Sequence, residues 1–381
     1  MRKIGIKKLL KHAAKPLSVV VCVVIAAILL TGEGALQFGQ SLALLSVGMM
    51  RPEGGVHVLN ERLERIPAAN GGGDTRLPYT TSPYQPGTGN QPDPQYPAVD
   101  NLYEYEYSGE YDRTVPPEAG DGGRVVEEQL SPGGQFVQNI AIKNNSSHTV
   151  DISSGLEMKP ELGLKDTDEP QVLIMHTHTT EAYMTYYAGY YNAADPTRSF
   201  DNNINVMAAG DMLAARLRAA GIGVIHDVTI FDNPKYTGAY DRSAQRIKEI
   251  LAQNPSIKVV IDLHRDAISR AENVRCKPTT VVNGLKAAQL MILTSVHSSD
   301  AVPHPDWQHN FGLAVRLQQE INTEYPGLVR PLNLVDSRYN QHLTRGSLLI
   351  EVGSEANTPD EAIYSAKLLG ESLAKVLHSL K

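Results

Sequence analysis

Three short polar motifs in this chain each follow directly on a short apolar run. The runs are residues 172–175, 257–263 and 348–350, and all are rich in valine, isoleucine and leucine. Runs of this length and composition are typical of buried strands in a parallel sheet. The carboxyl ends of parallel strands meet at one edge of a sheet, and ligands of open α/β sheets bind there. The sequence therefore predicts an α/β fold with all three motifs at one edge.

The three motifs supply histidine and glutamate side chains. The first contains His176, His178 and Glu181, the second contains His264, and the third contains Glu351. Histidine and carboxylate groups are the ligands of catalytic zinc (Zn²⁺) sites, and a further carboxylate can act as the base. The chain has only 2 cysteines, which cannot build a thiolate zinc site. Any metal here is therefore expected to be held by histidine and carboxylate.

The second motif also fits a purely structural role. His264 could be a buried histidine paired with a nearby aspartate. Asp262 and Asp266 both flank it, and either could orient its second ring nitrogen. The position of His264 at a predicted strand end favours a ligand.

The third motif has its own structural alternative. Glu351 adjoins the apolar run 348–350, and a carboxylate is costly to bury there unless it is paired or reactive. A salt bridge to Arg265 or Arg338 would satisfy it. The functional interpretation is a general base that removes a proton from water.

The N-terminal part of the chain carries a topological signal. Basic residues precede the apolar run 17–30, which has the length of a signal-peptide core. Extending the run to residue 38 makes a single membrane span over 17–38. We expect an uncleaved anchor rather than a cleaved signal peptide, with residues 1–16 as a basic cytoplasmic tip. The predicted location is the cell membrane, with one pass and the remaining chain outside the cytoplasm.

The region after the predicted anchor divides by composition. Residues 71–123 are rich in glycine, proline, aspartate and tyrosine without a sustained apolar period, which predicts a disordered segment. We expect residues 39–124 to form a low-complexity linker. Residues 125–169 are expected to form a small lead-in element, and residues 170–381 the main domain. The formal net charge of −7 argues against nucleic-acid binding, because surfaces that bind phosphate are usually basic.

Strand and helix patterns alternate in the main domain. The predicted strands are residues 171–175, 222–226, 257–263, 289–294 and 348–352, and the predicted helices are 205–219, 240–253, 311–321 and 359–380. The last helix has Thr358 as its expected N-cap and Pro359 at its first position. This alternation predicts βαβ units and a mostly parallel, twisted sheet flanked by helices on both faces.

With these motifs in place, the chain resembles the stage II sporulation protein P family, a branch related to the zinc-dependent N-acetylmuramoyl-L-alanine amidases. The resemblance covers about residues 171–380. Besides the three motifs, it includes Tyr240-Asp-Arg-Ser243, Tyr325-Pro-Gly-Leu328 and Arg338-Tyr-Asn-Gln-His342. The basic tip, the single anchor and the low-complexity spacer are also similar to that family.

The resemblance implies an amidase-like α/β fold, a single zinc ion and Glu351 as the catalytic glutamate. The implied reaction is cleavage of peptidoglycan between N-acetylmuramic acid and the stem peptide, with a second activity on peptide cross-links. The implied setting is engulfment of the forespore, with stage II sporulation proteins D and M as partners. Two alternatives stay open: a wall-binding protein without catalysis, and a membrane-anchored scaffold.

The zinc ligands are carried over by motif. The resemblance implies His264 and one histidine of the first motif, for which His178 is expected and His176 is the alternative. Glu181 is the expected third ligand. Wider amidases take a glutamate from the start of the first helix, and there this chain offers only Asp201, which is the alternative.

Overall fold

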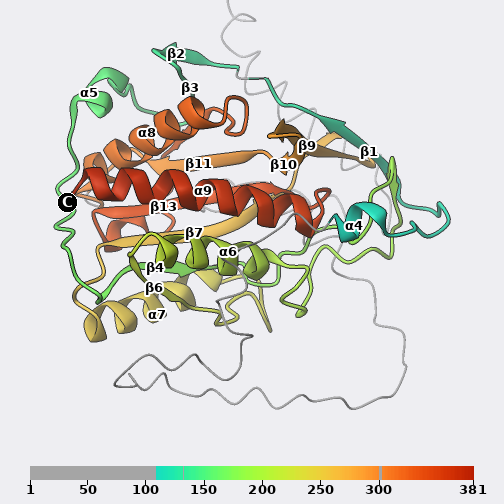
Figure 1. Cartoon of the computed structure of the whole chain (residues 1–381), viewed down its shortest axis with the longest axis horizontal. Helices are drawn as coiled ribbons and strands as arrows, with labels where there is room; N and C mark the ends of the chain where they lie inside the picture. The colour runs from blue at the N-terminus through green and yellow to red at the C-terminus, as the bar shows by residue number, and fades with distance from the viewer. Residues whose placement is uncertain (1–108, 132, 300–302) are drawn as a thin grey trace, which may run out of the picture. The chain divides into compact units, whose positions relative to one another are not determined.

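The computed structural model describes residues 109–131, 133–299 and 303–381 (Figure 1). The predicted cytoplasmic tip, the predicted anchor at 17–38 and most of the predicted linker lie outside these residues. Within the described part of the chain, no helix has the length and apolar character needed to cross a membrane.

A sheet of eight strands forms the centre of the domain (Figure 1). From one edge to the other its strands are β2 (Gln135–Val137), β3 (Ile140–Asn144), β12 (Leu332–Val335), β11 (Leu290–Ser295), β13 (Gly346–Ser354), β7 (Val259–Asp266), β4 (Pro170–Met175) and β6 (Gly223–His226). The run β13-β7-β4-β6 is parallel, as is β3-β12-β11. β11 pairs antiparallel with β13, and β2 with β3. The α/β class is confirmed, and the sheet is mixed rather than uniformly parallel.

Helices cover both faces of this sheet, as the sequence predicts. The long helices are α6 (Val206–Ala219), α7 (Ala239–Gln253), α8 (Trp307–Glu324) and α9 (Pro359–Ser379). α6, α8 and α9 pack on the face toward the viewer in Figure 1, where they share one apolar core with Val172 and Ile174 of β4. α7 packs on the opposite face with Leu173 and Met175. Alternate residues of β4 thus face the two cores, as the period of a strand requires.

Three shorter helical segments complete the helices of the described residues. They are α4 (Glu110–Arg113), α5 (Ile152–Glu157) and the 3-10 turn η2 (Gln341–Leu343).

The start of α9 is fixed by the cap that the sequence predicts. The side chain of Thr358 accepts a hydrogen bond from the backbone N–H of Glu361, and the Glu361 carboxylate accepts one from the Thr358 N–H at 3.1 Å. Pro359 occupies the first helical position. This reciprocal arrangement satisfies two N–H groups that the helix leaves unpaired. α9 therefore begins at the predicted residue.

A second, smaller sheet was not predicted from the sequence. It contains β10 (Leu285–Ala288), β9 (Val274–Val282), β1 (Gly123–Glu128) and β5 (Tyr190–Tyr191), and β8 (Ser269–Ala271) also pairs with β9. β1 runs parallel to β9 although the two are far apart in the chain. Such a pairing leaves no local signal. Since β1 joins this sheet and β3 joins the main sheet, the predicted lead-in element shares both sheets with the main domain.

The end of the predicted linker is folded against the domain. The Tyr111 N–H donates to Asp360 Oδ2 at 2.9 Å, and the Tyr190 hydroxyl donates to the Pro117 carbonyl at 2.5 Å. The expectation of a disordered linker up to residue 124 is therefore wrong for the described residues 109–124. Composition misled because these backbone groups find their partners far along the chain.

A buried ion pair joins the second sheet to α9. Lys277 Nζ of β9 lies 2.6 Å from Glu361 Oε1 of α9, and the two side chains are 1% and 0% exposed. Glu361 also accepts a hydrogen bond from Asn357 at 2.7 Å. The pair therefore couples the second sheet to the helix cap of the main domain.

We predict that Lys277→Met will lower the free energy of unfolding by about 3–5 kcal/mol, because it leaves the Glu361 charge buried without its cation. Chemical denaturation would measure the loss. Lys286→Met is the matched control, since Lys286 and Lys277 both lie 4.1 Å from the Tyr187 ring and both approach Glu127. Lys286 is 36% exposed, so its loss should cost no more than about 1 kcal/mol. Equal losses for the two variants would contradict this view.

Candidate active site

The three polar motifs meet on neighbouring strands. β4, β7 and β13 are adjacent and parallel, and Glu351 is the register partner of His264. β7 extends to Asp266 and β13 to Ser354, so His264 and Glu351 lie within their strands, near the carboxyl ends, rather than after them. Strand pairing therefore places the second and third motifs side by side.

His264 lies between two carboxylates. Its Nε2 is 2.9 Å from Asp262 Oδ1, and its Nδ1 is 3.4 Å from Glu181 Oε2. Burial alone would lower the pKa of His264, but Asp262 and Glu181 raise it well above its ordinary value. Of the two flanking aspartates, Asp262 holds the ring, whereas Asp266 pairs with Arg330 at 2.8 Å.

His176 points into the core instead of toward His264. Its Nδ1 is 2.8 Å from the Leu263 carbonyl, and its Nε2 is 2.8 Å from Nε2 of His226. Gly210 of α6 makes room for this pair, since a Cβ there would lie 2.7 Å from His176 Nε2. Burial lowers the pKa of His176 to about 3. Both ring nitrogens of His176 are thus engaged in the fold.

His178 lies beside His264. The two ring centroids are 5.2 Å apart, and the His178 ring stacks on Tyr236 at 4.2 Å. Burial lowers the pKa of His178 to about 3 as well, so its ring is neutral, which is the form that binds metal. Of the two histidines in the first motif, the geometry favours His178 as a ligand.

The two candidates for a third ligand differ in position. Glu181 is buried, approaches His264 and accepts a hydrogen bond from the Arg265 N–H at 3.2 Å. Asp201 is exposed, and its Oδ1 accepts from the backbone and side chain of Asn203. Asp201 therefore stabilises its own turn, and Glu181 is the carboxylate beside the histidines.

Glu351 has a buried carboxylate oxygen that lacks a partner. Within the described residues, its Oε2 makes no hydrogen bond. The expected alternative partners are used elsewhere, because Arg265 and Arg338 donate to backbone carbonyl groups. Burial, followed by the nearby charge of Asp266, raises the pKa of Glu351 to about 8. The carboxyl group is therefore placed to exchange protons near neutral pH.

The donor atoms fit a zinc ion in part. The 3.4 Å between His264 Nδ1 and Glu181 Oε2 is close to the ~3.3 Å between two ligands of a tetrahedral zinc with bonds of about 2.0–2.1 Å. Throughout the described ranges, no group of three or more histidine, cysteine or acidic side chains is already arranged to hold a metal. One ligand pair thus has the right spacing, and the His178 ring lies next to it, with its centroid 5.2 Å from that of His264.

Aromatic residues around these ligands were not predicted as site residues. Tyr236 stacks on His178, and the Arg198 guanidinium lies 4.7 Å from the centre of the Tyr236 ring. Tyr240 and Tyr339 pack on one another with ring centroids 5.3 Å apart. The signal that could have found the latter two is their place within motifs that carry the family resemblance.

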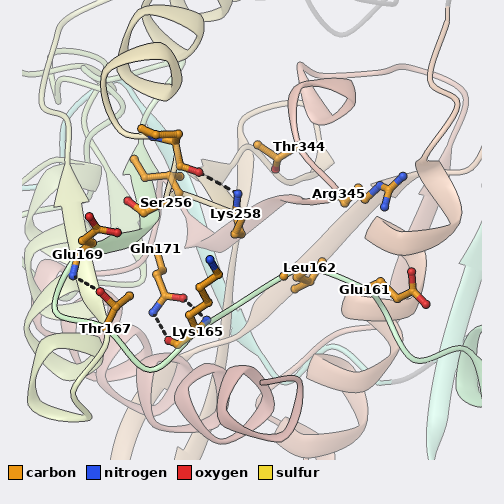
Figure 2. Close-up of a pocket in the computed structure, with 13 residues that line it drawn as sticks. Glu161, Leu162, Lys165, Thr167, Glu169, Gln171, Ser256, Lys258, Thr344 and Arg345 are labelled. Atoms are coloured by element: carbon orange, nitrogen blue, oxygen red, sulfur yellow. Dashed lines mark hydrogen bonds between the residues drawn. The ribbon is translucent and has the colours of Figure 1, made fainter.

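A cavity of about 650 Å³ lies at the other end of the same strands (Figure 2). Gln171 near the start of β4, Lys258 just before β7, and Thr344 and Arg345 just before β13 line it, together with Lys165. None of the candidate site residues contributes to it. It lies at the amino ends of the strands, so it is separate from the candidate active site.

We predict that Glu351→Gln will stabilise the chelator-treated protein in a pH-dependent way. Between about pH 4.5 and 8 the unfolded chain ionises this carboxyl group while the folded chain keeps it protonated, so stability falls as pH rises through this window. The variant escapes this loss. Its melting temperature should therefore match that of the parent near pH 4.5 and exceed it at pH 8.5. The corresponding gain in the free energy of unfolding at pH 8.5 should be on the order of a few kcal/mol. A difference that does not change with pH would contradict the burial of Glu351.

The comparisons with known proteins agree with the motifs. The family model described as "Stage II sporulation protein P (SpoIIP)" matches residues 103–374. Stage II sporulation protein P of Bacillus subtilis (strain 168) is 28% identical over 220 residues, which cover 55% of this chain and 51% of that protein. The match thus spans about half the length of this curated relative.

Solved amidase structures are similar at a much lower level. The N-acetylmuramoyl-L-alanine amidase AmiC2 of Nostoc punctiforme is 13% identical, with 56% of this chain and 98% of that chain covered at a TM-score of 0.34. The CwlD amidase of Clostridioides difficile, solved with the GerS lipoprotein, is 14% identical, with 55% and 98% covered at 0.34. The family model, by contrast, covers well over half of the chain. The protein therefore belongs to the stage II sporulation protein P family.

Proposed function

We propose that this protein is a zinc-dependent peptidoglycan hydrolase that cleaves the N-acetylmuramoyl–L-alanine amide bond. Membership of the family supports a role in the sporulation cell wall. The observation that carries the proposal is the pairing of His264 with Glu351, whose Oε2 is buried and has no hydrogen-bond partner among the described residues. Such an unsatisfied carboxylate is costly to maintain unless it reacts.

The proposed zinc ligands are His178, His264 and Glu181. A bound zinc ion would supply Lewis-acid activation of water and of the amide carbonyl. Asp262 would hold the other ring nitrogen of His264, since its Oδ1 lies 2.9 Å from Nε2, and so fix the direction of the ligating nitrogen. Asp262 is itself held by the Thr177 N–H and hydroxyl at 2.8 and 2.7 Å. Asp262 is therefore held in position beside His264 by the backbone and side chain of Thr177.

Glu351 is the proposed proton carrier. Its carboxylate would take a proton from the attacking water and deliver it to the nitrogen of the leaving L-alanine. A nearby metal cation would favour the ionised form needed for the first step. The raised pKa of the carboxyl group, about 8, suits the second step, in which the protonated group must release its proton near neutral pH.

Membership of the family and the anchor predicted from the sequence support a proposal for where the reaction takes place. We propose that the chain is held in the cell membrane by residues 17–38 and acts outside the cytoplasm, on wall between the membranes during engulfment. Stage II sporulation proteins D and M are the proposed partners, and cross-link cleavage is a proposed second activity. A wall-binding or scaffold protein without catalysis would instead bind peptidoglycan and release no fragments.

We predict that the full-length chain will bind about one zinc per molecule, as a site of three protein ligands would. His264→Ala and Glu181→Ala should lose most of it, whereas Asp201→Ala should keep it. His178→Ala should lose more zinc than His176→Ala, whose main effect should be on stability. Elemental analysis after dialysis measures occupancy. Full occupancy in His264→Ala, or loss in Asp201→Ala alone, would refute the ligand set.

We also predict that Glu351→Gln will fold, keep its zinc and lose at least about 10²-fold in turnover, the low end of what a general acid–base contributes. Release of dye from labelled peptidoglycan measures turnover, and a chelator-treated sample sets the background. A variant that retains turnover within a few-fold of the parent would exclude Glu351 as the proton carrier.

A further inference from the structure

Tyr240 lies beside both proposed histidine ligands and has no role in the scheme above. It occupies the first turn of α7. Its ring meets the edge of His178 at a centroid distance of 5.4 Å and is nearly parallel to His264 at 6.5 Å. Asp262 and His264 lie two and four residues after Val260, which faces the α7 core, so they point to the same side of the sheet, the side that carries Tyr240.

The hydroxyl group of Tyr240 is available. Its ring is enclosed by His178, His264 and Tyr339, yet within the described residues the hydroxyl makes no hydrogen bond, and only the backbone carbonyl of Tyr240 is bonded. The Tyr240 residue is half-buried, so a bound substrate can reach this hydroxyl. Burial raises the pKa of Tyr240 well above its ordinary value, so the hydroxyl is protonated at neutral pH and can donate.

The backbone of Tyr240 is tied to Asp262 by a chain of hydrogen bonds. Asn340 Nδ2 donates to the Tyr240 carbonyl and to Ser243 Oγ, and the Ser243 hydroxyl lies 2.9 Å from Thr177 Oγ1, to which it can donate. The Thr177 hydroxyl in turn donates to Asp262 Oδ2 at 2.7 Å, and Asp262 Oδ1 lies 2.9 Å from His264 Nε2. Tyr240 is therefore positioned relative to His264 before any substrate arrives.

The loop that packs on Tyr240 is held in an unfavourable backbone conformation. Tyr339 and Asn340 have φ angles of 41° and 57°, a region that residues other than glycine rarely adopt. Here Asn340 Nδ2 donates to the Tyr240 carbonyl at 2.9 Å and to Ser243 Oγ at 3.0 Å. Backbone strain of this kind concentrates at functional sites, where the surrounding structure over-determines it. Here the conformation of this loop places Asn340 where its side chain can bind the Tyr240 carbonyl.

We propose that the Tyr240 hydroxyl donates a hydrogen bond to the carbonyl oxygen of the scissile amide and stabilises the negative charge that develops on it. This inference rests on the proposed function. The O–H bond stays intact, so Tyr240 acts as a fixed donor while Glu351 moves the proton. A donor fixed in advance is effective because it needs no reorganisation during the reaction. The N-terminal end of α7, with its partial positive charge, lies on the same side.

Tyr240→Phe tests the inference, because it removes the hydroxyl and keeps the ring. Loss of a single donor of this kind typically lowers kcat by about 10²–10³-fold. We therefore expect a fall of about that size in dye release by the full-length chain, with KM within a few-fold, zinc content unchanged and melting temperature unchanged. The split between kcat and KM matters, because a residue that only binds the ground state would change KM.

Tyr325→Phe is the matched control. Its hydroxyl donates to Glu371 at 2.7 Å, away from the site residues, so the variant loses one hydroxyl and should keep its activity. An active parent protein together with an unchanged kcat in Tyr240→Phe would overturn the inference and leave the amidase proposal standing. Loss of zinc or of stability in Tyr240→Phe would also overturn it, since the role would then be structural. A parent protein that is folded and zinc-loaded but inactive would instead refute the proposed function.

Discussion

The register between β7 and β13 places Glu351 directly beside His264. A carboxylate and an imidazole on neighbouring parallel strands cannot drift apart without breaking the sheet, because a slip of one residue would turn each side chain to the opposite face. The apolar residues on either side make that slip costly. Ile261 and Leu263 face one core, and Val260 faces the other. The packing of the sheet is therefore what fixes the distance between the proposed ligand and the proposed proton carrier.

The protonation of His264 depends on the two carboxylates beside it. The imidazole lies between Asp262 and Glu181, and its raised pKa means that a proton occupies this place when no metal does. A metal cation bound there would exchange for that proton, so affinity should depend on pH. Burial, followed by the nearby charge of Asp266, also raises the pKa of Glu351. Both neighbours therefore hold a proton near neutral pH, but they differ in charge: His264 is a cation between carboxylates, and Glu351 is a neutral acid because burial disfavours its ionised form.

The sequence was sufficient for five strands of the main sheet, and it did not predict β2, β3, β12 or the second sheet. β4, β7 and β13 could be predicted because each is a compact apolar run, and the start of α9 because Thr358 and Pro359 are a local cap signal. β1 and β9 could not be, because their pairing links segments far apart in the chain and each carries charged residues. Lys277 is one of those charged residues, and it is buried only because Glu361 of α9 meets it. The residues around Lys277 in the sequence therefore give no sign of its pairing with Glu361, nor do those of β1 of their pairing with β9.

The site shows the same division. Spacing alone could not separate His176 from His178, and the structure does so through a remote residue, His226, which engages His176 in the core. Tyr240 was visible in the sequence only as part of a motif, since its position beside His178 depends on how α7 packs against the sheet. Such residues are found through tertiary contacts rather than through periodicity.

The most direct test is mass spectrometry of peptidoglycan digested by the full-length chain. An amidase that works through Glu351 releases stem peptides with a free L-alanine amino group and leaves glycan strands whose N-acetylmuramic acid carries a free lactyl carboxylate. Both products should disappear with Glu351→Gln. Digestion that cuts only the glycan strands, or wall that is bound and left intact by the zinc-loaded protein, would contradict the account.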